Sequence, residues 1–440
     1  MRSRGLASLT GRRAALFGVA AAVILAAAFA IRVAYVDATP GMKLVHDALD
    51  YDNHAVSIAT VGHYSDSLAY GRKTAFRPPG YPYALAAVYK VAGVARAGEP
   101  RRVAVARGMQ VVIGTVLVAM IGLLAAQLWG AVTALLSMGL AAVYVPLVTM
   151  SGTVMSEPLF AIFMLGCLGA AIMHRRSAHA WRWALLAGAL AGLAILTRAN
   201  ALILLLPLAL VAWDRRPRWS VRALGPPVAL VVVAVLVVSP WTIRNARTLH
   251  HFVPVSTQLG SALAGTYNDD ARTDRDNPAS WRSLRHVASY QDLVGDLAHT
   301  NEAVLEKQLR HRAERYAFDH PTYIAVVAFW TTVRAFDLGG LDWAKHTART
   351  VSIDSTWALR NVRCFWLFAV LALAGAFTTA ARRTPWFVWA FPALMYLSVV
   401  FLVIETPRYR TPMDPFIVML AALALVAAGR RVVARRAGSR

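Results

Sequence analysis

The sequence predicts an all-α polytopic membrane protein, and three features of its composition support this. Hydrophobic residues fill 58% of the 440 positions, whereas soluble domains average about 45–50% apolar residues. Charged residues make up only 16%, and they are absent from long stretches that are suited to crossing a bilayer. Lys and Arg outnumber Asp and Glu by 46 to 23. Because this basic excess is set in apolar sequence, we expect anionic membrane lipids and phosphates as partners, and no nucleic acid.

The first predicted span covers residues 14–31, which contain no charge and follow Arg12 and Arg13. Such a segment is typical of a signal peptide or of a membrane anchor. The small residues at positions 28–30 resemble a signal-peptidase site. We nevertheless expect an uncleaved helix, because the topology of the remaining spans requires it.

Residues 108–156 contain no charged side chain, and their length fits two helices with a break near Trp129 and Gly130. Seven further apolar runs follow at residues 158–173, 183–197, 199–213, 223–243, 364–381, 384–404 and 415–429. Together with the first span, these runs predict a bundle of about ten transmembrane helices. The runs 78–89 and 321–333 are shorter and aromatic, and we interpret them as interfacial helices. Cys167 and Cys364 lie inside apolar runs, which excludes a disulfide framework.

The basic residues of the links predict the orientation, because such residues concentrate on the cytoplasmic side. With both termini cytoplasmic, the groups at 174–176, 215–218, 382–383 and 430–436 all face inward. Residues 1–430 then form one transmembrane domain, followed by a basic cytoplasmic tail at 431–440. Two long loops, 37–102 and 244–362, face outward and are expected to cover the outer mouth of the bundle. Within the second loop, residues 301–319 have helical character.

An acidic cluster lies in the first outer loop. If residues 46–54 are helical, Asp47, Asp50, Tyr51 and His54 share one face. Two neighbouring carboxylates suit a general base, because a like charge raises the pKa of one of them. The competing interpretation is a solvated acidic helix. Asp50 and Asp52 also form a D-x-D pattern, which is a weak indication of metal binding.

Five more segments place polar residues at the outer ends of spans. Arg77 precedes a rigid bend of prolines and glycine that leads to Tyr81, and a guanidinium held there can grip a phosphate bidentately. Glu157 begins a span, where the helix dipole alone would also explain a carboxylate. The remaining candidates for substrate binding are Arg198, Arg244, Glu405, Arg408 and Tyr409. For the arginines, snorkelling toward the membrane surface is the alternative.

Taken in order, these motifs resemble the bacterial C-superfamily (GT-C) membrane glycosyltransferases. The motifs are a D-x-x-x-Y segment at 47–51, Phe-Arg-Pro-Pro-Gly-Tyr-Pro at 76–82, Ser-Glu-Pro-Leu-Phe at 156–160, Leu-Thr-Arg at 196–198, Pro-Trp-Thr-Ile-Arg-Asn at 240–245 and Arg-Tyr-Arg-x-Pro at 408–412. Within the superfamily, the sequence is similar to the group of protein O-mannosyltransferases and the lipid A aminoarabinose transferase. The resemblance covers about residues 14–429.

This resemblance implies a GT-C-like bundle, a polyprenyl-phosphate sugar as donor and an inverting transfer without metal or other cofactor. It assigns Asp47 as the general base and Tyr51 as its companion tyrosine. Arg77 and Arg198 occupy positions that are basic in the family and face the lipid phosphate. Glu157 matches an acidic position of the second outer loop, and Arg408 falls in the C-terminal Arg-Tyr motif.

One departure from the family pattern concerns the second carboxylate. Close relatives have an Asp-Glu pair where this chain has Asp47 and Ala48, so Asp50 or Glu157 is expected to supply the second acid.

The resemblance implies an active site on the outer face of a bacterial cytoplasmic membrane. A lipid or polysaccharide transporter or flippase, and a ligase of polyprenyl-linked polymers, are the alternative functions. The sequence leaves the sugar open, and the acceptor open between protein, polysaccharide and lipid.

Overall fold

The computed structural model describes residues 11–65, 71–213, 220–295, 300–402 and 406–438. Over these ranges the chain forms α-helices and short 3₁₀ helices, and its β-structure is limited to one isolated bridge between Ser65 and Lys73. The predicted all-α polytopic class is therefore confirmed. The basic link 215–218 and Glu405, both named as functional or topological candidates, lie outside the described residues.

Ten predicted spans correspond to apolar helices in the described ranges. Seven are long enough to cross a bilayer, namely α1 (Arg12–Ala38), α4 (Glu99–Trp129), α7 (Glu157–Arg176), α8 (Ala180–Thr197), α10 (Gly225–Leu249, preceded by η3, Val221–Leu224), α17 (Ser355–Ala376) and α20 (Asp414–Gly438). Three are shorter, namely α5 (Ala131–Val143), η2 with α9 (Ala199–Leu204 and Leu205–Trp213) and α19 (Trp386–Val400). The two runs interpreted as interfacial form α3 (Gly80–Val91) and α15 (Pro321–Ala335).

Small residues allow the spanning helices to approach closely. A Cβ added to Gly188 of α8 would lie 2.3 Å from the carbonyl oxygen of Leu230 in α10. Gly375 of α17 meets the backbone of Leu420 in α20 in the same way. The buried core is apolar and is contributed mainly by α4, α5, α7, α8, α9 and α20. Helix packing in membranes depends on such close contacts, since lipid tails are as apolar as the side chains.

The uncharged stretch 108–156 is broken twice. The first break is at Gly130, where a φ of 93° turns the chain as the sequence predicted. The second, at Tyr144, was not predicted and separates α5 from α6 (Val145–Met150). Arg32 of α1 lies against this second break. Its guanidinium donates to the carbonyls of Ala141 and Ala142, which are among the last of α5 and therefore have no partner within the helix.

Three predicted boundaries were wrong because helices continue past the edge of their apolar runs. Helix α10 extends to Leu249, so Arg244 lies within its last turns and not in a loop. Helix α17 begins at Ser355 instead of residue 364, and α20 continues through the basic tail to Gly438. Polar residues at a helix end that projects beyond the hydrocarbon layer cost no free energy of transfer into the bilayer. Hydropathy therefore locates the apolar centre of a span but not the ends of its helix.

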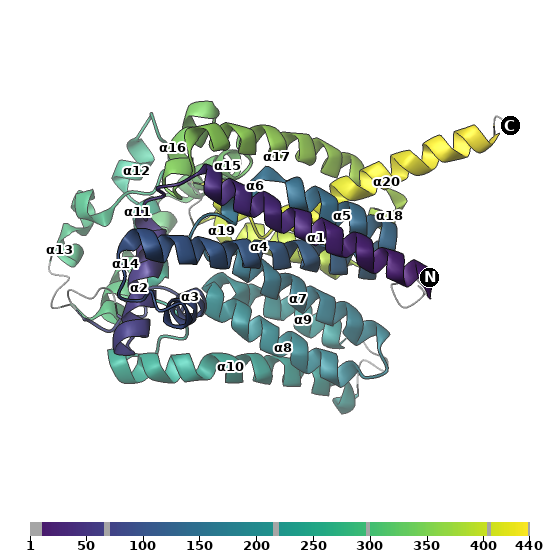
Figure 1. Ribbon diagram of the computed structural model, residues 1–440. Helices are drawn as coiled ribbons and strands as arrows, with labels where there is room; N and C mark the ends of the chain where they lie inside the picture. Colours follow the sequence, from purple (N-terminus) through teal and green to yellow (C-terminus); the bar gives the residue numbers. More distant parts are fainter. Residues whose placement is uncertain (1–10, 66–70, 214–219, 296–299, 403–405, 439–440) are drawn as a thin grey trace.

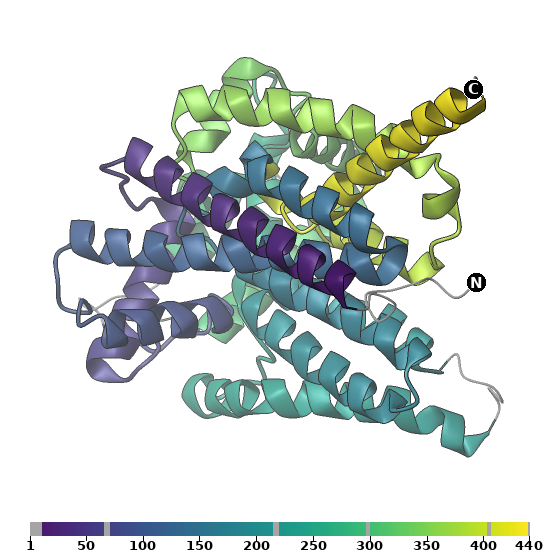
Figure 2. The same ribbon diagram turned by 45° about the vertical axis from the view of Figure 1, so that its right-hand side comes forward.

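The remaining elements are outside this set of apolar helices. They are α2 (His46–Val61), α11 (Gln258–Thr266), α12 (Asp269–Thr273), η4 (Leu284–His286), η5 (Ala288–Tyr290), α13 (Gln291–Val294), α14 (Glu302–Asp319), α16 (Leu341–Arg349), α18 (Thr379–Arg382) and η6 (Pro407–Arg410). Helix α14 confirms the helical character predicted for residues 301–319. The ribbon shows α2 and α11–α14 at the end of the bundle opposite both termini (Figure 1). Turned by 45°, it shows α1 crossing over α4 and α5 (Figure 2).

Candidate active site

Asp47 lies in the first turn of α2, as the acidic cluster predicted. Its Oδ1 accepts a hydrogen bond of 2.5 Å from Nη2 of Arg77, and its Oδ2 accepts one from Nη2 of Arg408. Its side chain is 19% exposed. Burial alone would raise the pKa of Asp47, but the charges of Arg408 and Arg77 lower it well below its ordinary value. The expectation that a neighbouring carboxylate raises this pKa is therefore wrong, because guanidiniums are closer.

Arg77 reaches Asp47 from the Pro-rich bend before α3. The same guanidinium donates to Oδ2 of Asp50 at 2.6 Å from Nη2 and 3.2 Å from Nε. It packs over the rings of Phe76 and Tyr51, 5.0 and 5.8 Å from their centroids. The bend itself is fixed by Tyr64, whose hydroxyl donates to the carbonyl of Arg77. The rigid placement predicted for this guanidinium agrees with the geometry.

Glu157 and Arg198 form the second half of the site. Glu157 begins α7 and is buried, and Nη1 of Arg198 lies 2.8 Å from its Oε1. Nε of Arg408 lies 3.8 Å from the same oxygen. Neither carboxylate oxygen of Glu157 has a well-oriented hydrogen-bond donor among the described residues. A buried carboxylate that is paired by charge but not saturated by hydrogen bonds can still accept one from a ligand.

Tyr409 and Tyr51 line the space between these ion pairs. The ring of Tyr409 lies 5.4 Å from the guanidinium carbon of Arg198 and 4.8 Å from that of Arg408. The hydroxyl of Tyr51 shares a hydrogen bond of 3.1 Å with Oγ of Ser156, which Arg198 also contacts at 3.4 Å. Aromatic faces and hydroxyls therefore surround the charges.

The six charged groups balance in number. Three carboxylates face three guanidiniums. The carboxylates are those of Asp47, Asp50 and Glu157, and the guanidiniums are those of Arg77, Arg198 and Arg408. We call these six residues the acid–arginine cluster. Burial disfavours the charged form of Arg77 and of Arg408, but Asp47 and the other acids keep the pKa of both above the ordinary value for arginine. Asp47, Arg77 and Arg408 are therefore charged at neutral pH.

Some predicted site residues lie beside this cluster without joining it. The ring of Tyr81 is fully buried 5.0 Å from that of Tyr51, and its hydroxyl has no partner among the described residues. Arg244 donates to the carbonyls of Thr74 and Tyr64, so it supports the loop that carries Arg77. His54, expected on the same face as Asp47, hydrogen-bonds the carbonyl of Ser65 instead.

Asp52 has a separate partner set. It is fully buried, accepts from the hydroxyl of Tyr89 at 2.7 Å and pairs with Arg102 at 2.7 Å. Its side chain is thus directed away from Asp50, and the two do not act together as the D-x-D pattern would suggest. Over the described ranges, no three His, Cys, Asp or Glu side chains gather in a group that could hold a metal ion.

Sequence reasoning missed Ser156 and Glu302. The sequence signal for Ser156 was only its position directly before Glu157. Glu302, counted as part of a helical charge pattern, instead accepts from Oγ1 of Thr74 at 2.5 Å and from the backbone N–H of Ala75 at 3.1 Å. It thereby ties α14 to the loop before Arg77. Contacts between residues 227 or 228 positions apart leave no local pattern in a sequence.

Comparisons with known proteins agree with the motif order. Residues 76–243 match the family of dolichyl-phosphate-mannose-protein mannosyltransferases. This segment contains the Pro-rich bend, Glu157 and Arg198. A search of curated protein sequences found no match.

Solved structures of one archaeal enzyme share the architecture. The oligosaccharyltransferase of Archaeoglobus fulgidus, tethered to an acceptor peptide, aligns with a TM-score of 0.54 and 14% identity over 95% of this chain and 50% of that one. The same enzyme, AglB, with an inhibitory peptide and dolichol-phosphate aligns with a TM-score of 0.53 and 14% identity over 95% and 51%. ArnT from Cupriavidus metallidurans, bound to undecaprenyl phosphate, aligns with a TM-score of 0.40 and 16% identity over 93% and 76%.

The present chain spans about half the length of the archaeal oligosaccharyltransferase it matches, with 50% of that chain covered. The shared part is the helical bundle. Residues 76–243 match the mannosyltransferase family and the bundle has the fold of the archaeal oligosaccharyltransferase, so the predicted resemblance is confirmed at the level of the fold.

Proposed function

We propose that this protein is an inverting membrane glycosyltransferase of the GT-C type. It transfers a sugar from a polyprenyl-phosphate donor to an acceptor at the outer face of a bacterial cytoplasmic membrane. The relatives with bound dolichol-phosphate and undecaprenyl phosphate support this class of donor. The archaeal relative's acceptor is a peptide, and for this chain protein, polysaccharide and lipid all stay open as acceptors.

The acid–arginine cluster is the observation that carries the proposal. Its side chains come from five separate segments, namely α2, the bend before α3, the start of α7, the end of α8 and η6. Bringing buried charges together costs desolvation energy, and ion pairs alone rarely repay it. Such an arrangement is expected where a charged substrate has to bind and react.

The three guanidiniums supply the binding site for the donor phosphate. In the absence of donor they are paired with carboxylates, so a phosphodiester competes for their N–H groups. Arg77 and Arg408 can each offer two N–H groups to phosphate oxygens. When the sugar–phosphate bond breaks, its electron pair stays on the phosphate oxygen. Donors directed at this growing charge contribute about 3 kcal/mol each.

Asp47 is the proposed base. The acceptor hydroxyl attacks the anomeric carbon from the face opposite the phosphate, Asp47 takes the hydroxyl proton, and the configuration inverts. A carboxylate held by two guanidiniums is a weak base, because its pKa is low. Once Arg77 and Arg408 turn toward phosphate, that restraint is relieved and Asp47 becomes more basic. Donor binding thus activates the base. Asp50 and Glu157 pair with the arginines and hold them in place.

Replacement of the base gives the first test. Asp47→Asn keeps the size of the side chain but cannot accept the proton, so transfer from radiolabelled polyprenyl-phosphate sugars should fall about 10²- to 10⁴-fold. Asp342→Asn is the matched control, because the Asp342 side chain is 98% exposed and its ion-pair partner among the described residues is Lys345. Full activity in Asp47→Asn would remove the proposed base.

The same assay separates an enzyme from a flippase. A flippase moves labelled lipid across vesicle membranes and forms no glycosidic product, whereas a transferase forms product in detergent, where no second leaflet exists. Parallel reactions with a chelator test the expectation that transfer needs no metal. Product made only in sealed vesicles would contradict the assignment as a transferase. Product lost with chelator would contradict the expectation that transfer needs no metal.

A further inference from the structure

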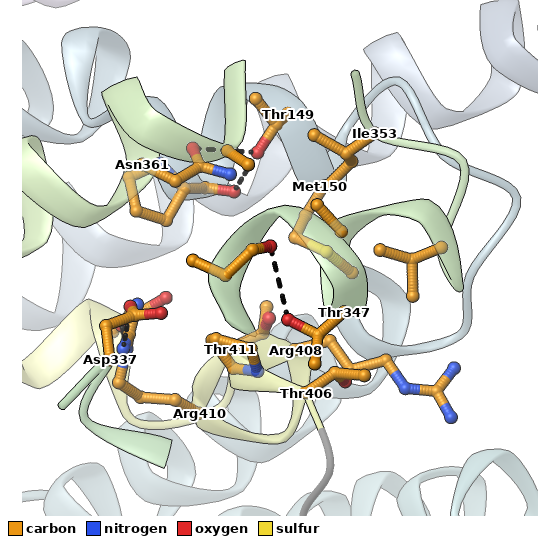
Figure 3. Close-up of a pocket in the computed structure, with 17 residues that line it drawn as sticks. Thr149, Met150, Asp337, Thr347, Ile353, Asn361, Thr406, Arg408, Arg410 and Thr411 are labelled. Atoms are coloured by element: carbon orange, nitrogen blue, oxygen red, sulfur yellow. Dashed lines mark hydrogen bonds and ion pairs between the residues drawn. The ribbon is translucent and has the colours of Figure 1, made fainter. Parts of the chain in front are cut away.

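A separate cavity lies behind η6, next to the acid–arginine cluster. Its volume is about 50 Å³, and its walls come from α6, α16, α17, η6, the start of α20 and the turn after α15. Figure 3 shows these lining residues around the cavity, with the side chain of Arg408 leaving the wall on the side away from Asp337. Arg408 therefore belongs to both the cavity and the cluster.

Polar groups in the cavity wall have hydrogen-bonding capacity to spare. Thr406 is only 5% exposed, yet its Oγ1 has no hydrogen-bond partner among the described residues. Asn361 accepts a hydrogen bond from Thr149, and within the same ranges its amide nitrogen donates to no other group. An unsatisfied buried hydroxyl costs about 1–3 kcal/mol, so Thr406 indicates a partner that occupies the cavity.

Two carboxylates add acceptors to this wall. Arg410 pairs with Oδ2 of Asp337 at 2.9 Å and with Oδ1 of Asp414 at 3.0 Å. The described residues make no hydrogen bond to the second oxygen of either carboxylate. Both side chains are at most 4% exposed, and both line the cavity. Their free oxygens can accept hydrogen bonds from hydroxyl groups.

Apolar side chains also line the cavity, among them Met150, Val351 and Ile353. A lining that combines hydroxyl, amide and carboxylate groups with apolar side chains matches a sugar, which presents C–H groups on its faces and hydroxyls at its edge. One water-sized group needs about 10–15 Å³. The cavity thus has room for about three hydroxyl-sized groups, which corresponds to the edge of one ring.

We propose that this cavity binds the hydroxyl-bearing edge of the donor's sugar ring and thereby selects which sugar is transferred. Thr406 and Asn361 donate to the sugar hydroxyls, and Asp337 and Asp414 accept from them. The cavity lies beside Arg408 and therefore next to the proposed phosphate site. A sugar whose phosphate contacts Arg408 enters the cavity if it lies across η6. This inference rests on the proposed glycosyl transfer.

Binding of lipids with and without a sugar tests the inference without turnover. Purified protein is titrated with undecaprenyl-phosphate mannose, galactose, glucose or arabinose, and with undecaprenyl phosphate alone. At least one sugar should raise the affinity above that of the bare lipid. Thr406→Val and Asn361→Leu should each lose roughly 3- to 10-fold of that gain while binding bare undecaprenyl phosphate as before. Thr347→Val is the control, because Thr347 lies in the same wall but its hydroxyl is bonded to the carbonyls of Trp343 and Ala344.

The outcomes separate this inference from the proposed function. Wild-type protein that binds the bare lipid as tightly as every sugar-bearing lipid would overturn the cavity assignment alone. Protein that binds none of these lipids would overturn the proposed function and the cavity with it. In transfer assays, an effect of Thr406→Val on the KM of the acceptor, with the donor KM unchanged, would also contradict the assignment, because the cavity would then hold the acceptor.

Discussion

At the scale of single residues, the charge of Asp47 has a consequence for stability. Its pKa is lowered in the folded protein by Arg408 and Arg77, despite burial, and the unfolded value is about 3.9. A group whose pKa is depressed on folding stabilises the protein fully above the unfolded pKa and loses this contribution as the pH falls through the folded pKa. The stabilisation by Asp47 is thus present from about pH 5 upward.

Thermal unfolding in detergent should reveal this charge. Asp47→Asn leaves two buried guanidiniums short of a counter-charge, so its unfolding midpoint should lie below that of the wild type at pH 5–8. The difference should shrink only below about pH 4, where the carboxylate of the unfolded wild-type chain begins to take up a proton. Tryptophan fluorescence at stepped pH measures both midpoints. A difference that already vanishes between pH 7 and pH 5 would mean that the pKa of Asp47 is not depressed.

Candidate site residues could be predicted from the sequence where they lie in a rigid or acidic motif. They could not be predicted where their role depends on neighbours in the folded structure. Asp47 and Arg77 were identified from their motifs. Arg408 and Arg410 lie two positions apart in one motif, yet Arg408 pairs with Asp47 while Arg410 is buried against Asp337 and Asp414. The contact with Asp337 is created only by the packed bundle, whereas Asp414 lies four positions after Arg410 and is a local partner.

At the scale of elements, Arg32 compensates for the unpredicted break between α5 and α6. It is fully buried, and its guanidinium contacts Ser151 in addition to the carbonyls at the end of α5. Arg32→Met keeps most of the side-chain volume but leaves those carbonyls without donors, so it should destabilise the protein by about 2 kcal/mol. The change is measured as a lower unfolding midpoint. Arg13→Met is the control, since Arg13 lies exposed at the start of the same helix.

The contact between α8 and α10 gives a second prediction about elements. A methyl group at Gly188 would lie 2.3 Å from a backbone oxygen of Leu230. Because backbone cannot rotate away as a side chain can, Gly188→Ala should destabilise the folded bundle by about 1–3 kcal/mol.

Gly139→Ala provides the comparison, because a methyl group there meets nothing within 4 Å. That variant should be neutral or stabilising by up to about 1 kcal/mol through helix propensity. Equal unfolding midpoints for the two variants would contradict a tight contact between α8 and α10.

Element identity was more predictable than element boundaries. Apolar length located the seven helices that are long enough to cross a bilayer and the three shorter apolar helices, because the cost of placing charge in a bilayer affects every span equally. It did not locate the break at Tyr144, which precedes Pro146 at the start of α6 and which hydropathy does not mark. A helix can end there because a buried arginine from another helix satisfies its carbonyls, and this long-range contact leaves no trace in the local sequence.

At the scale of the whole molecule, the two ends of the bundle differ in what they carry. Both termini lie at one end (Figure 1), together with the basic residues that finish α7, such as Arg175 and Arg176. The opposite end carries α2 and α11–α14. This separation permits a lipid-linked donor to enter from the membrane while the polar acceptor approaches from water. It also predicts which end faces the cytoplasm.

Labelling of single cysteines in intact cells tests the orientation. In a chain in which Cys167 and Cys364 are replaced, a cysteine at Asp270 of α12 should react with an impermeant maleimide from outside. A cysteine at Ala178, in the link between α7 and α8, should react only after the membrane is permeabilised. Both positions are exposed, so access differs only by side. We expect this labelling pattern because basic links stay in the cytoplasm during membrane insertion. The reverse labelling pattern would put Arg175 and Arg176 outside and the acid–arginine cluster at the cytoplasmic face, where an outward-facing transfer reaction has no site.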